Sequence, residues 1–183
     1  MAISGLVITY NEEKNIGKCI DALFEVCDEV IIVDSLSADN TVKIAEEKGA
    51  KVISQKFLGD GPQRTHGLPF CKNDWVLNLD ADEFLDKDAK EFILKGKYLE
   101  GDYDAFSFRV KNFLADELID FSGWYPDHKV RFFNKKTAQP SPAKVHQKIE
   151  TTNEKKVAVH ILHYGWESFE QIIAKKNQYS TWH

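Results

Sequence analysis

Two aspartates separated by one small residue, Asp80-Ala81-Asp82, are the residues of this sequence best suited to chemistry. They directly follow the apolar segment Asp74–Leu79, which predicts a buried strand. Carboxylates at this spacing can both reach a divalent cation or a ribose, and hard oxygen ligands favour Mg²⁺ or Mn²⁺, which commonly also bind substrate phosphates. The structural alternative is a pair of acids in a surface turn before a helix.

Two further apolar segments, Ile3–Tyr10 and Glu29–Asp34, also end in polar residues. The residues that gather at these two ends are Thr9, Tyr10, Asn11, Glu12, Asp34, Ser35 and Ser37. Open parallel sheets bind ligands beyond the carboxyl ends of their strands. Helix caps favour the same residue types, and a cap alone would account for Ser37 or Asp39. Three strand ends that all carry acids, amides or hydroxyls predict a binding site.

The elements that position these residues alternate between strands and helices in the first half of the chain. Strands are predicted at Ile3–Tyr10, Glu29–Asp34, Lys51–Ser54 and Asp74–Leu79, and helices at Lys14–Val26, from Asp39 to near Gly49, and near Asp86–Leu94. The segment from Gly59 to Phe70 holds at most a short helix with Pro62 in its first turn. This order predicts an α/β fold with a doubly wound, mostly parallel central sheet.

The second half of the chain changes in character. Strands are predicted at Ala105–Phe113, Lys129–Phe133, Val145–Thr151 and Val157–Leu162, without intervening helices. We therefore expect a mixed or antiparallel half attached to the same sheet, within a single domain over 1–183 divided into halves 1–95 and 96–183. A capping pattern at Ser168 opens a last helix that is still periodic at His183, which suggests either a C-terminally truncated chain or a helix that docks against a missing element.

Composition narrows the partners and the compartment. The formal charge of −5 argues against nonspecific nucleic-acid binding, although five residues form a modest basic patch, namely Lys129, Arg131, Lys135, Lys136 and Lys144. That patch suits solvated strand ends or an anionic acceptor or membrane surface. The three cysteines lack metal or redox spacing and are expected to be buried thiols. With no signal peptide or membrane span in the sequence, we expect a cytoplasmic protein.

The motifs ITYNEE, VIIVDSLSADNT, Arg64 in a Gly-rich segment and WVLNLDADEFL, in this order, resemble the inverting family-two glycosyltransferases of the nucleotide-diphospho-sugar transferase fold. The resemblance covers about the first 95 residues. The segments GWYPDHKVRFFNK, VHQ and LHYG are more loosely similar to the bacterial branch that builds the lipopolysaccharide inner core, often by adding glucose. The resemblance implies a UDP-sugar donor, a saccharide or lipid-linked acceptor and a divalent metal.

The resemblance also implies roles for individual residues. The nucleotide-sugar site would comprise Thr9, Tyr10, Asn11, Glu12, Asp34 at the uracil ring, Ser35, Ser37, Arg64 at the diphosphate and Asp80 at the ribose or a metal-bound water. Asp82 would bind the metal directly. A late histidine often adds a metal or phosphate contact in relatives, and His163 is the candidate, with His160 and His146 as competitors.

Direct displacement at a sugar carbon needs a base that takes the proton of the acceptor hydroxyl. Relatives place it in an acidic motif after the aspartate pair, which suggests Asp127 in Trp124-Tyr125-Pro126-Asp127, while Glu83 is the rival. Pro126-Asp127 could also be a simple turn. The branch usually has an acid after its VH pair, and Gln147 at this position weakens a role in proton transfer there.

Other functions fit the sequence less well. A phosphoryl-transfer hydrolase usually carries its aspartate pair on the first strand, with a downstream lysine and acidic pair. A dinucleotide-dependent dehydrogenase needs a glycine-rich loop after the first strand, where this chain has TYNEEKN. The non-enzymatic alternative is a nucleotide-sugar-binding module without turnover. A membrane-peripheral location would suit a lipid-linked acceptor and the terminal helix with Lys175 and Lys176, but an ordinary core helix is equally consistent.

Overall fold

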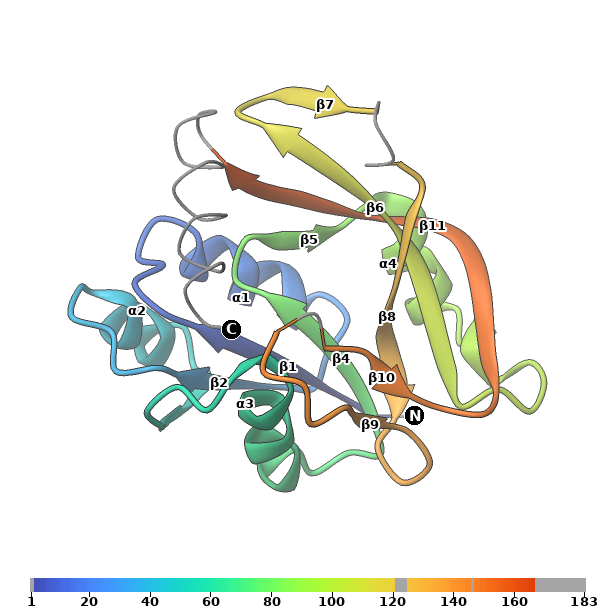
Figure 1. The fold of residues 1–183 in the computed structure, drawn as a ribbon, viewed down its shortest axis with the longest axis horizontal. Coiled ribbons are helices and arrows are strands. Elements are labelled where there is room, and N and C mark those ends of the chain that lie inside the picture. Colours follow the sequence, from blue (N-terminus) through green and yellow to red (C-terminus); the bar gives the residue numbers. More distant parts are fainter. Residues whose placement is uncertain (1, 121–124, 146, 167–183) are drawn as a thin grey trace.

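A computed structural model describes residues 2–120, 125–145 and 147–166 of the chain. Its first half alternates strands and helices (Figure 1). The elements are β1 (Ile3–Thr9), α1 (Ile16–Phe24), β2 (Glu29–Asp34), α2 (Thr41–Glu47), β3 (Lys51–Ser54), α3 (Asp60–Gly67), a 3₁₀ turn at Leu68–Phe70 and β4 (Trp75–Asp80). The four strands lie in the order β3-β2-β1-β4 and all pair in parallel, which confirms the doubly wound half.

The second half extends the same sheet with mixed pairing. Its elements are β5 (Glu83–Leu85), α4 (Lys87–Leu94), a 3₁₀ turn at Lys97–Leu99, β6 (Ala105–Leu114), β7 (Glu117–Ile119), β8 (Asp127–Asn134), β9 (Gln139–Pro140), β10 (Ile149–Glu150) and β11 (Glu154–Trp166). The sheet continues β4-β8-β6-β11-β5, with β8 antiparallel to both neighbours and β11 parallel to β6. The predicted mixed half on a common sheet is therefore confirmed.

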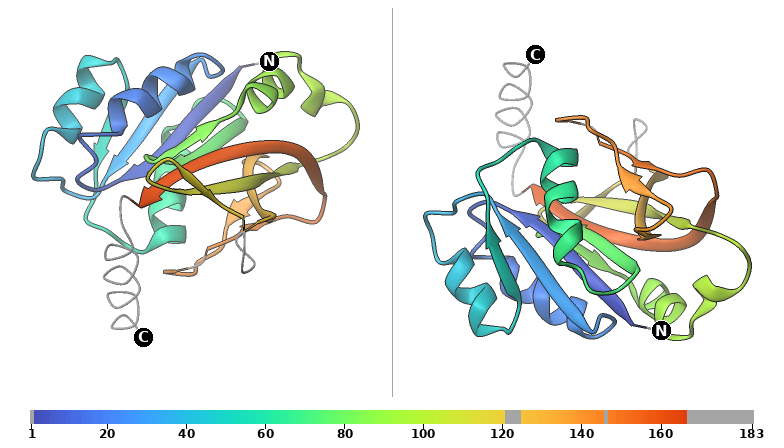
Figure 2. Two further views of the ribbon diagram at one scale, coloured as in Figure 1. Left: turned by 90° about the horizontal axis from the view of Figure 1, so that it is seen from above. Right: turned by 90° about the horizontal axis from the view of Figure 1, so that it is seen from below.

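Helices cover both faces of this sheet (Figure 2). The larger core cluster packs α1 and α4 against one face, around the aromatic residues Trp75, Phe106 and Phe132. A smaller cluster packs Leu68 against Leu6 and Val33 on the other face, next to α3. Strands covered on both faces are uniformly apolar, which explains why β1 and β2 lack an alternating pattern.

Helix α3 lies unusually close to its neighbours because of its glycines. A Cβ on Gly67 would come within 2.6 Å of a Leu6 methyl and 2.7 Å of a Val33 methyl. A Cβ on Gly61 would collide with the carbonyl oxygen of Ser141, and the backbone N–H of Gly61 donates to Ala143 O over 3.0 Å. The glycines thus let this short helix approach the sheet closely enough for Arg64 to reach Asp80 at the end of β4.

Some element boundaries differ from the sequence prediction. The strand expected at Val145–Thr151 is limited to β10, which pairs only with β9 in a separate two-stranded sheet. Strands β5 and β7 are not predicted by the sequence, since three residues are too few to show a period. Strand β11 spans 13 residues, longer than predicted, because polar residues at its start still pair with β6. The helix expected after Ser168 lies outside the described residues.

Candidate functional site

Asp80 ends β4 between two buried arginines. The Arg64 guanidinium, on α3, donates to Asp80 Oδ1 and to Asn78 Oδ1, the latter over 2.7 Å, while Arg131, on β8, donates to Asp80 Oδ2 over 3.1 Å. The two arginine side chains are 3% and 4% exposed respectively. Burial by itself would raise the pKa of the Asp80 carboxyl, but the two guanidinium charges outweigh it and hold that pKa well below its usual range.

Arg131 reaches this site through a β-bulge. The pairing of β8 with β6 runs Phe106↔Phe132 and then Ser107↔Val130, so Arg131 is the extra residue on β8. A bulge bends the strand and redirects a side chain. The guanidinium also donates to Glu83 Oε1 over 2.6 Å, and Glu83 and Asp80 outweigh the burial that would lower the pKa of Arg131, so that pKa is raised.

Glu83 is held from both ends of its carboxylate. Oε1 accepts from Arg131, and Oε2 accepts the backbone N–H of Asp80 over 3.1 Å. The residue is 1% exposed. This arrangement suits a residue that shapes the turn around Asp80 better than one that must meet an acceptor hydroxyl.

Asp82 lies beside His163. Strands β5 and β11 pair with Glu83 opposite His163, and Tyr164 N–H donates to Asp82 O over 3.0 Å. This brings His163 Nε2 to 3.4 Å from Asp82 Oδ2, while Asn112 Oδ1 lies 2.8 Å from the other imidazole nitrogen, Nδ1. Burial would lower the pKa of His163, but the hydrogen bond and charge of Asp82 raise it above its usual value.

Gly165 leaves the space in which this pair meets. A Cβ at position 165 would lie 2.5 Å from His163 Nε2 and 3.2 Å from Asp82 Oδ2. Any side chain at this position would therefore push the His163 imidazole away from its place beside Asp82. A hard carboxylate oxygen beside an imidazole nitrogen fits a divalent cation. Among residues 2–120, 125–145 and 147–166, no three His, Cys, Asp or Glu residues are grouped to hold a metal alone.

The ends of β1 and β2 are tied into one polar network. Ser37 donates from its hydroxyl to Asp34 Oδ1 and from its backbone N–H to Asp34 Oδ2 over 2.9 Å. Asn11 N–H donates to Ser37 Oγ over 2.8 Å, and Ala38 N–H donates to Asn11 Oδ1 over 2.8 Å. Asn11 adopts a left-handed backbone with φ of 53°, a conformation that asparagine tolerates better than most residues. Asp34 is 1% exposed.

The other residues predicted at these two strand ends differ in exposure. Thr9 pairs with Asp34 across the strands, and its buried hydroxyl has no hydrogen-bond partner among the described residues. Tyr10 is 60% exposed. Ser35 Oγ accepts from Gln63 Nε2 over 3.2 Å. Glu12 donates its backbone N–H to Thr41 Oγ1 over 2.8 Å, at the start of α2.

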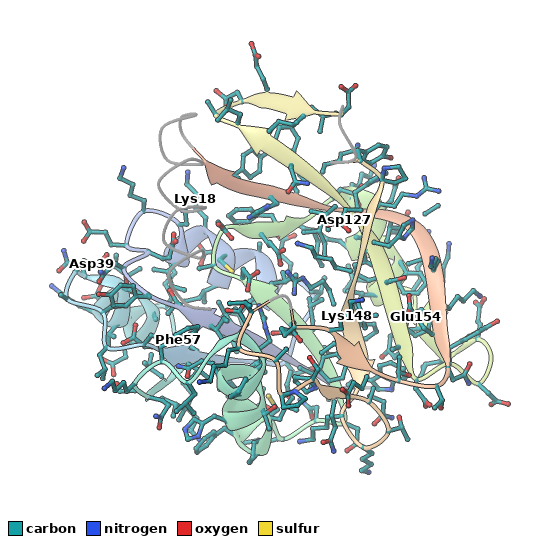
Figure 3. All side chains as sticks on the ribbon, in the orientation of Figure 1. Lys18, Asp39, Phe57, Asp127, Lys148 and Glu154 are labelled. Carbon is teal, nitrogen blue, oxygen red and sulfur yellow. The ribbon has the colours of Figure 1, made fainter. Side chains whose placement is uncertain are left out.

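Asp127 begins β8, on the other side of β6 from β11 (Figure 3). It pairs opposite Val110, so its side chain shares the face of β6 that carries Asn112. It lies four positions before Arg131, about 13 Å along the strand at ~3.3 Å per residue. Its carboxylate is 44% exposed and lies 3.8 Å from Lys129 Nζ. The geometry therefore places Asp127 on the same sheet face as the Asp82–His163 pair but well separated from Arg131.

The structure corrects the predicted basic patch and adds residues to the predicted site. The sequence suggests a basic patch that includes Arg131, but this residue is a buried ion-pair partner of Asp80 and Glu83. A charge embedded in the apolar run Val130–Phe133 was the available sign of a buried partner. Gln63, which is fully buried on α3 and bonds Ser35, was also missed, as were Asn112 and Gly165. Only tertiary contacts reveal the last three.

Among the histidine candidates for Asp82, the structure separates two and does not describe the third. His163 contacts Asp82, whereas the His160 imidazole instead bonds Asp86 and Tyr125. His146 and Trp124 lie outside the described residues. The three cysteines are free and buried, as predicted.

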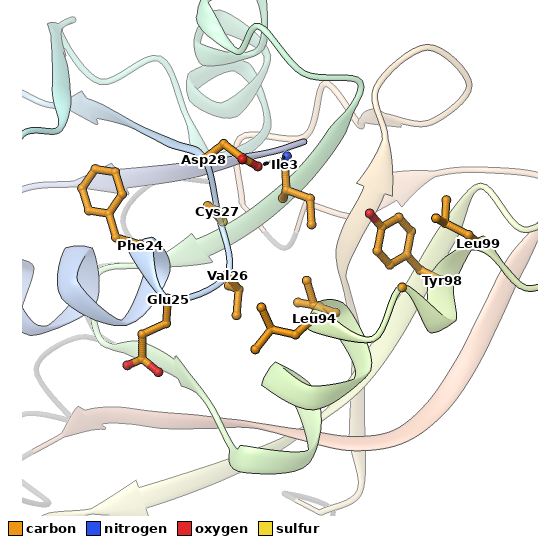
Figure 4. Close-up of a pocket in the computed structure, with 11 residues that line it drawn as sticks. Ile3, Phe24, Glu25, Val26, Cys27, Asp28, Leu94, Tyr98 and Leu99 are labelled. Carbon is orange, nitrogen blue, oxygen red and sulfur yellow. Dashed lines mark hydrogen bonds between the residues drawn. The ribbon is translucent and has the colours of Figure 1, made fainter. Parts of the chain in front are cut away.

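A cavity of about 350 Å³ lies at the opposite end of the sheet (Figure 4). It is lined by Ile3 at the start of β1, Phe24 and Leu94 at the ends of α1 and α4, Asp28 in the connection before β2, and Tyr98 in the 3₁₀ turn after α4. The cavity lies at the amino ends of the parallel strands, whereas the predicted site residues lie at the carboxyl ends, so none of them lines it. Among the helices described, none is long and apolar enough to cross a membrane.

The amino-acid sequence is similar to those of known proteins. The chain is 34% identical over 199 residues to a Rickettsia felis "uncharacterized glycosyltransferase", covering 98% of this chain and 68% of the relative. It is 36% identical over 98 residues to the "lipopolysaccharide core biosynthesis glycosyltransferase LpsC" of Rhizobium meliloti, covering 51% of this chain and 36% of that one. The chain thus spans about two thirds of the Rickettsia relative, and 65% of some others from that genus.

Solved structures share the fold. Glucosyl-3-phosphoglycerate synthase from Mycobacterium tuberculosis, in complex with Mn²⁺, UDP and glucosyl-3-phosphoglycerate, superimposes with a TM-score of 0.61 at 21% identity, covering 97% of this chain and 76% of that one. S. aureus TarS 1–349 in complex with UDP-GlcNAc gives 0.61 at 19% identity, covering 91% and 60%. The family model "Glycosyl transferase family 2" matches residues 4–146. The chain, with its acidic and hydroxyl residues at one edge of a mixed α/β sheet, therefore belongs to glycosyl transferase family 2 and has the nucleotide-diphospho-sugar transferase fold.

Proposed function

We propose that this protein is a metal-dependent inverting glycosyltransferase that moves a hexose, with UDP-glucose the first donor to test, to a saccharide acceptor in cell-envelope glycan or lipopolysaccharide core synthesis. The observation that carries the proposal is the meeting of Asp80 and Asp82 with Arg64 and His163 at the carboxyl end of β4. Ligands of open α/β sheets bind at this position.

The ends of β1 and β2 would bind the nucleoside. Asp34 is held in place by both the hydroxyl and the backbone N–H of Ser37, so its carboxylate is oriented before a uracil ring arrives. The Thr9 hydroxyl, which has no partner in the described part of the chain, lies on the neighbouring strand and offers a donor and an acceptor. A buried hydroxyl without a partner is costly, and a ligand atom that bonds it removes this cost.

The diphosphate would bind beside the Arg64–Asp80 ion pair and Asp82. Asp82 and His163 provide two protein ligands for Mg²⁺ or Mn²⁺, and such ions usually complete their shell with water and substrate phosphate oxygens. The cation would neutralise charge on the departing nucleoside diphosphate. Arg64 would add its positive charge on the same group, a contribution of several kcal/mol in a site shielded from water.

Asp127 would take the proton of the acceptor hydroxyl. Its carboxylate is 44% exposed, so an acceptor can reach it, and it shares a sheet face with the Asp82–His163 pair. Glu83 is the weaker choice, since both of its oxygens already accept hydrogen bonds and the residue is buried. The exposed carboxylate of Asp127 keeps its lone pairs open to a hydroxyl proton, as a general base requires.

The names of the similar proteins support the donor and metal classes. One solved neighbour is a complex with UDP and Mn²⁺, and another is a complex with UDP-GlcNAc. The partial relative LpsC is named for lipopolysaccharide core biosynthesis, which supports a cell-envelope acceptor.

The experiment measures binding and turnover separately. UDP binding is titrated with and without Mn²⁺, and UDP release is followed from a panel of UDP-sugars with and without saccharide acceptors. Asp82→Ala should abolish metal-dependent UDP binding, whereas Asp127→Ala should preserve binding and abolish transfer.

Each outcome has a distinct meaning. Failure of the unmodified protein to bind UDP in the presence of Mn²⁺ would refute the proposal. UDP binding without release from any donor would indicate a nucleotide-sugar-binding module instead. Full turnover by Asp127→Ala would refute the assignment of the base.

A further inference from the structure

Three side chains outside the donor site form a continuous hydrogen-bonded chain. His160 Nδ1 lies 3.0 Å from Asp86 Oδ2, and His160 Nε2 lies 3.1 Å from the Tyr125 hydroxyl. A neutral imidazole that donates from Nδ1 to the carboxylate can accept the tyrosine O–H at Nε2. The side chains of His160 and Asp86 are 16% and 20% exposed, so solvent competes little for these bonds.

Both carboxylate oxygens of Asp86 are used. Oδ1 accepts the backbone N–H of Ala89 over 2.8 Å and caps α4, while Oδ2 meets His160. The backbone N–H of Asp86 also donates to the carbonyl of His160 over 3.1 Å, which extends the β5–β11 ladder by one residue. Asp86 is therefore fixed by the backbone, and it in turn fixes the imidazole ring.

Each member of the chain is close in sequence to a residue of the proposed site. Asp86 follows Asp82 by four residues, His160 precedes His163 by three, and Tyr125 precedes Asp127 by two. The three segments come from different parts of the fold, namely the turn after β5, strand β11 and the approach to β8 (Figure 1).

The hydrogen-bonded chain lies on the far side of the β5–β11 ladder from the metal ligands. Glu83 pairs with His163, and three residues further along each strand Asp86 lies beside His160. Side chains three residues apart on a strand point to opposite faces. Asp86 and His160 can therefore hold the two strands without contacting a donor or acceptor.

We infer that the Asp86–His160–Tyr125 chain is a positioning device for the reaction. It fixes the segment that carries Asp127 relative to the strands that carry Asp82 and His163, and so sets the distance between base and donor. The inference rests on the proposed function, because it concerns the base of that reaction. None of the three side chains touches the reacting atoms; Tyr125 and His160 are positioning residues that act through Asp127. A displacement of about 1 Å in such a group is enough to slow a reaction strongly.

The test removes the tyrosine hydroxyl alone. Tyr125→Phe keeps the ring and deletes one hydrogen bond, and Tyr103→Phe is the matched control, because the Tyr103 hydroxyl has no partner among the described residues while its ring packs near Phe106. With the donor and acceptor, or donor and water, that give turnover in the unmodified protein, kcat should fall about fivefold in Tyr125→Phe, the equivalent of one hydrogen bond. The affinity for UDP with Mn²⁺ and the donor KM should stay within about twofold. Tyr103→Phe should leave all three values unchanged.

A second variant tests whether the tyrosine acts through the histidine. In His160→Leu, the additional change Tyr125→Phe should lower kcat no further, since the tyrosine's hydrogen-bond partner is already lost. Turnover of Tyr125→Phe equal to that of Tyr103→Phe, multiplicative losses in the double variant, or a parallel loss of UDP affinity would each overturn the inference.

A measurement independent of turnover covers variants that fold poorly or react slowly. The free energy of unfolding of the two single variants and the double variant should show coupling between Tyr125 and His160, and additive effects would show that the bond does not form in solution. Absence of UDP release from every donor by the unmodified protein would refute the proposed function itself, which distinguishes that failure from failure of this inference.

Discussion

Replacement of Arg131 by methionine should strongly destabilise this protein, although the residue lies in a strand that looks like a surface strand in sequence. Arg131 is 4% exposed and Glu83 is 1% exposed, so the variant leaves the buried Glu83 carboxylate with the Asp80 backbone N–H as its one remaining donor among the residues that the structure describes. Breaking a buried ion pair by removing one partner costs about 3–5 kcal/mol. Asp80 retains Arg64, so the loss is counted for Glu83 alone.

Urea unfolding of matched variants measures this effect. Lys136→Met removes an ion pair to Asp74 whose lysine side chain is 68% exposed, and it should cost less than about 1 kcal/mol. Adding Glu83→Gln to Arg131→Met removes the stranded charge and should recover a large part of the loss. The reasoning is refuted if Arg131→Met costs no more than Lys136→Met, or if Glu83→Gln recovers nothing.

Three further predictions concern acid stability, packing and thiols. The arginine partners of Asp80 hold its pKa below the unfolded value of about 3.9, so the stabilisation from this carboxylate is complete above that pH and is lost as the pH falls below it. The free energy of unfolding should therefore decrease more between pH 6 and pH 3 in the unmodified protein than in Asp80→Asn. Equal decreases in the two proteins would contradict this cause. Gly67→Ala should cost about 1–3 kcal/mol, because its Cβ would lie 2.6 Å from a Leu6 methyl. In the control Gly17→Ala, the Cβ would meet side-chain atoms of Lys48 and Ile44 at 3.2 Å or more, so a similar fall in Tm for both variants would argue against the clash. Burial raises the pKa of the Cys71 thiol to about 12, so a thiol reagent at pH 8 should modify it only after denaturant is added, and rapid modification of the native protein would contradict its burial.

The sequence by itself determined the fold class and the edge of the sheet at which the candidate site residues gather. Uniform apolar runs such as Glu29–Asp34 specify buried parallel strands, since both of their faces must be covered. The carboxyl ends of parallel strands converge, so the order of the strands along the chain was enough to place the polar residues at Asp34 and Asp80 on one edge. Local patterns therefore predicted that Asp34 and the Asp80–Asp82 pair lie at the same edge of the sheet.

Tertiary structure alone decided which charges meet there. Arg131 is 51 residues from Asp80 and reaches it through a bulge, an irregularity of strand pairing that no local period encodes. Likewise, the pairing of β5 with β11 selects His163 rather than His160 as the neighbour of Asp82, because a strand alternates its faces residue by residue. Residue types and their spacing identified the candidate residues, whereas the register between distant strands determined which side chains contact each other.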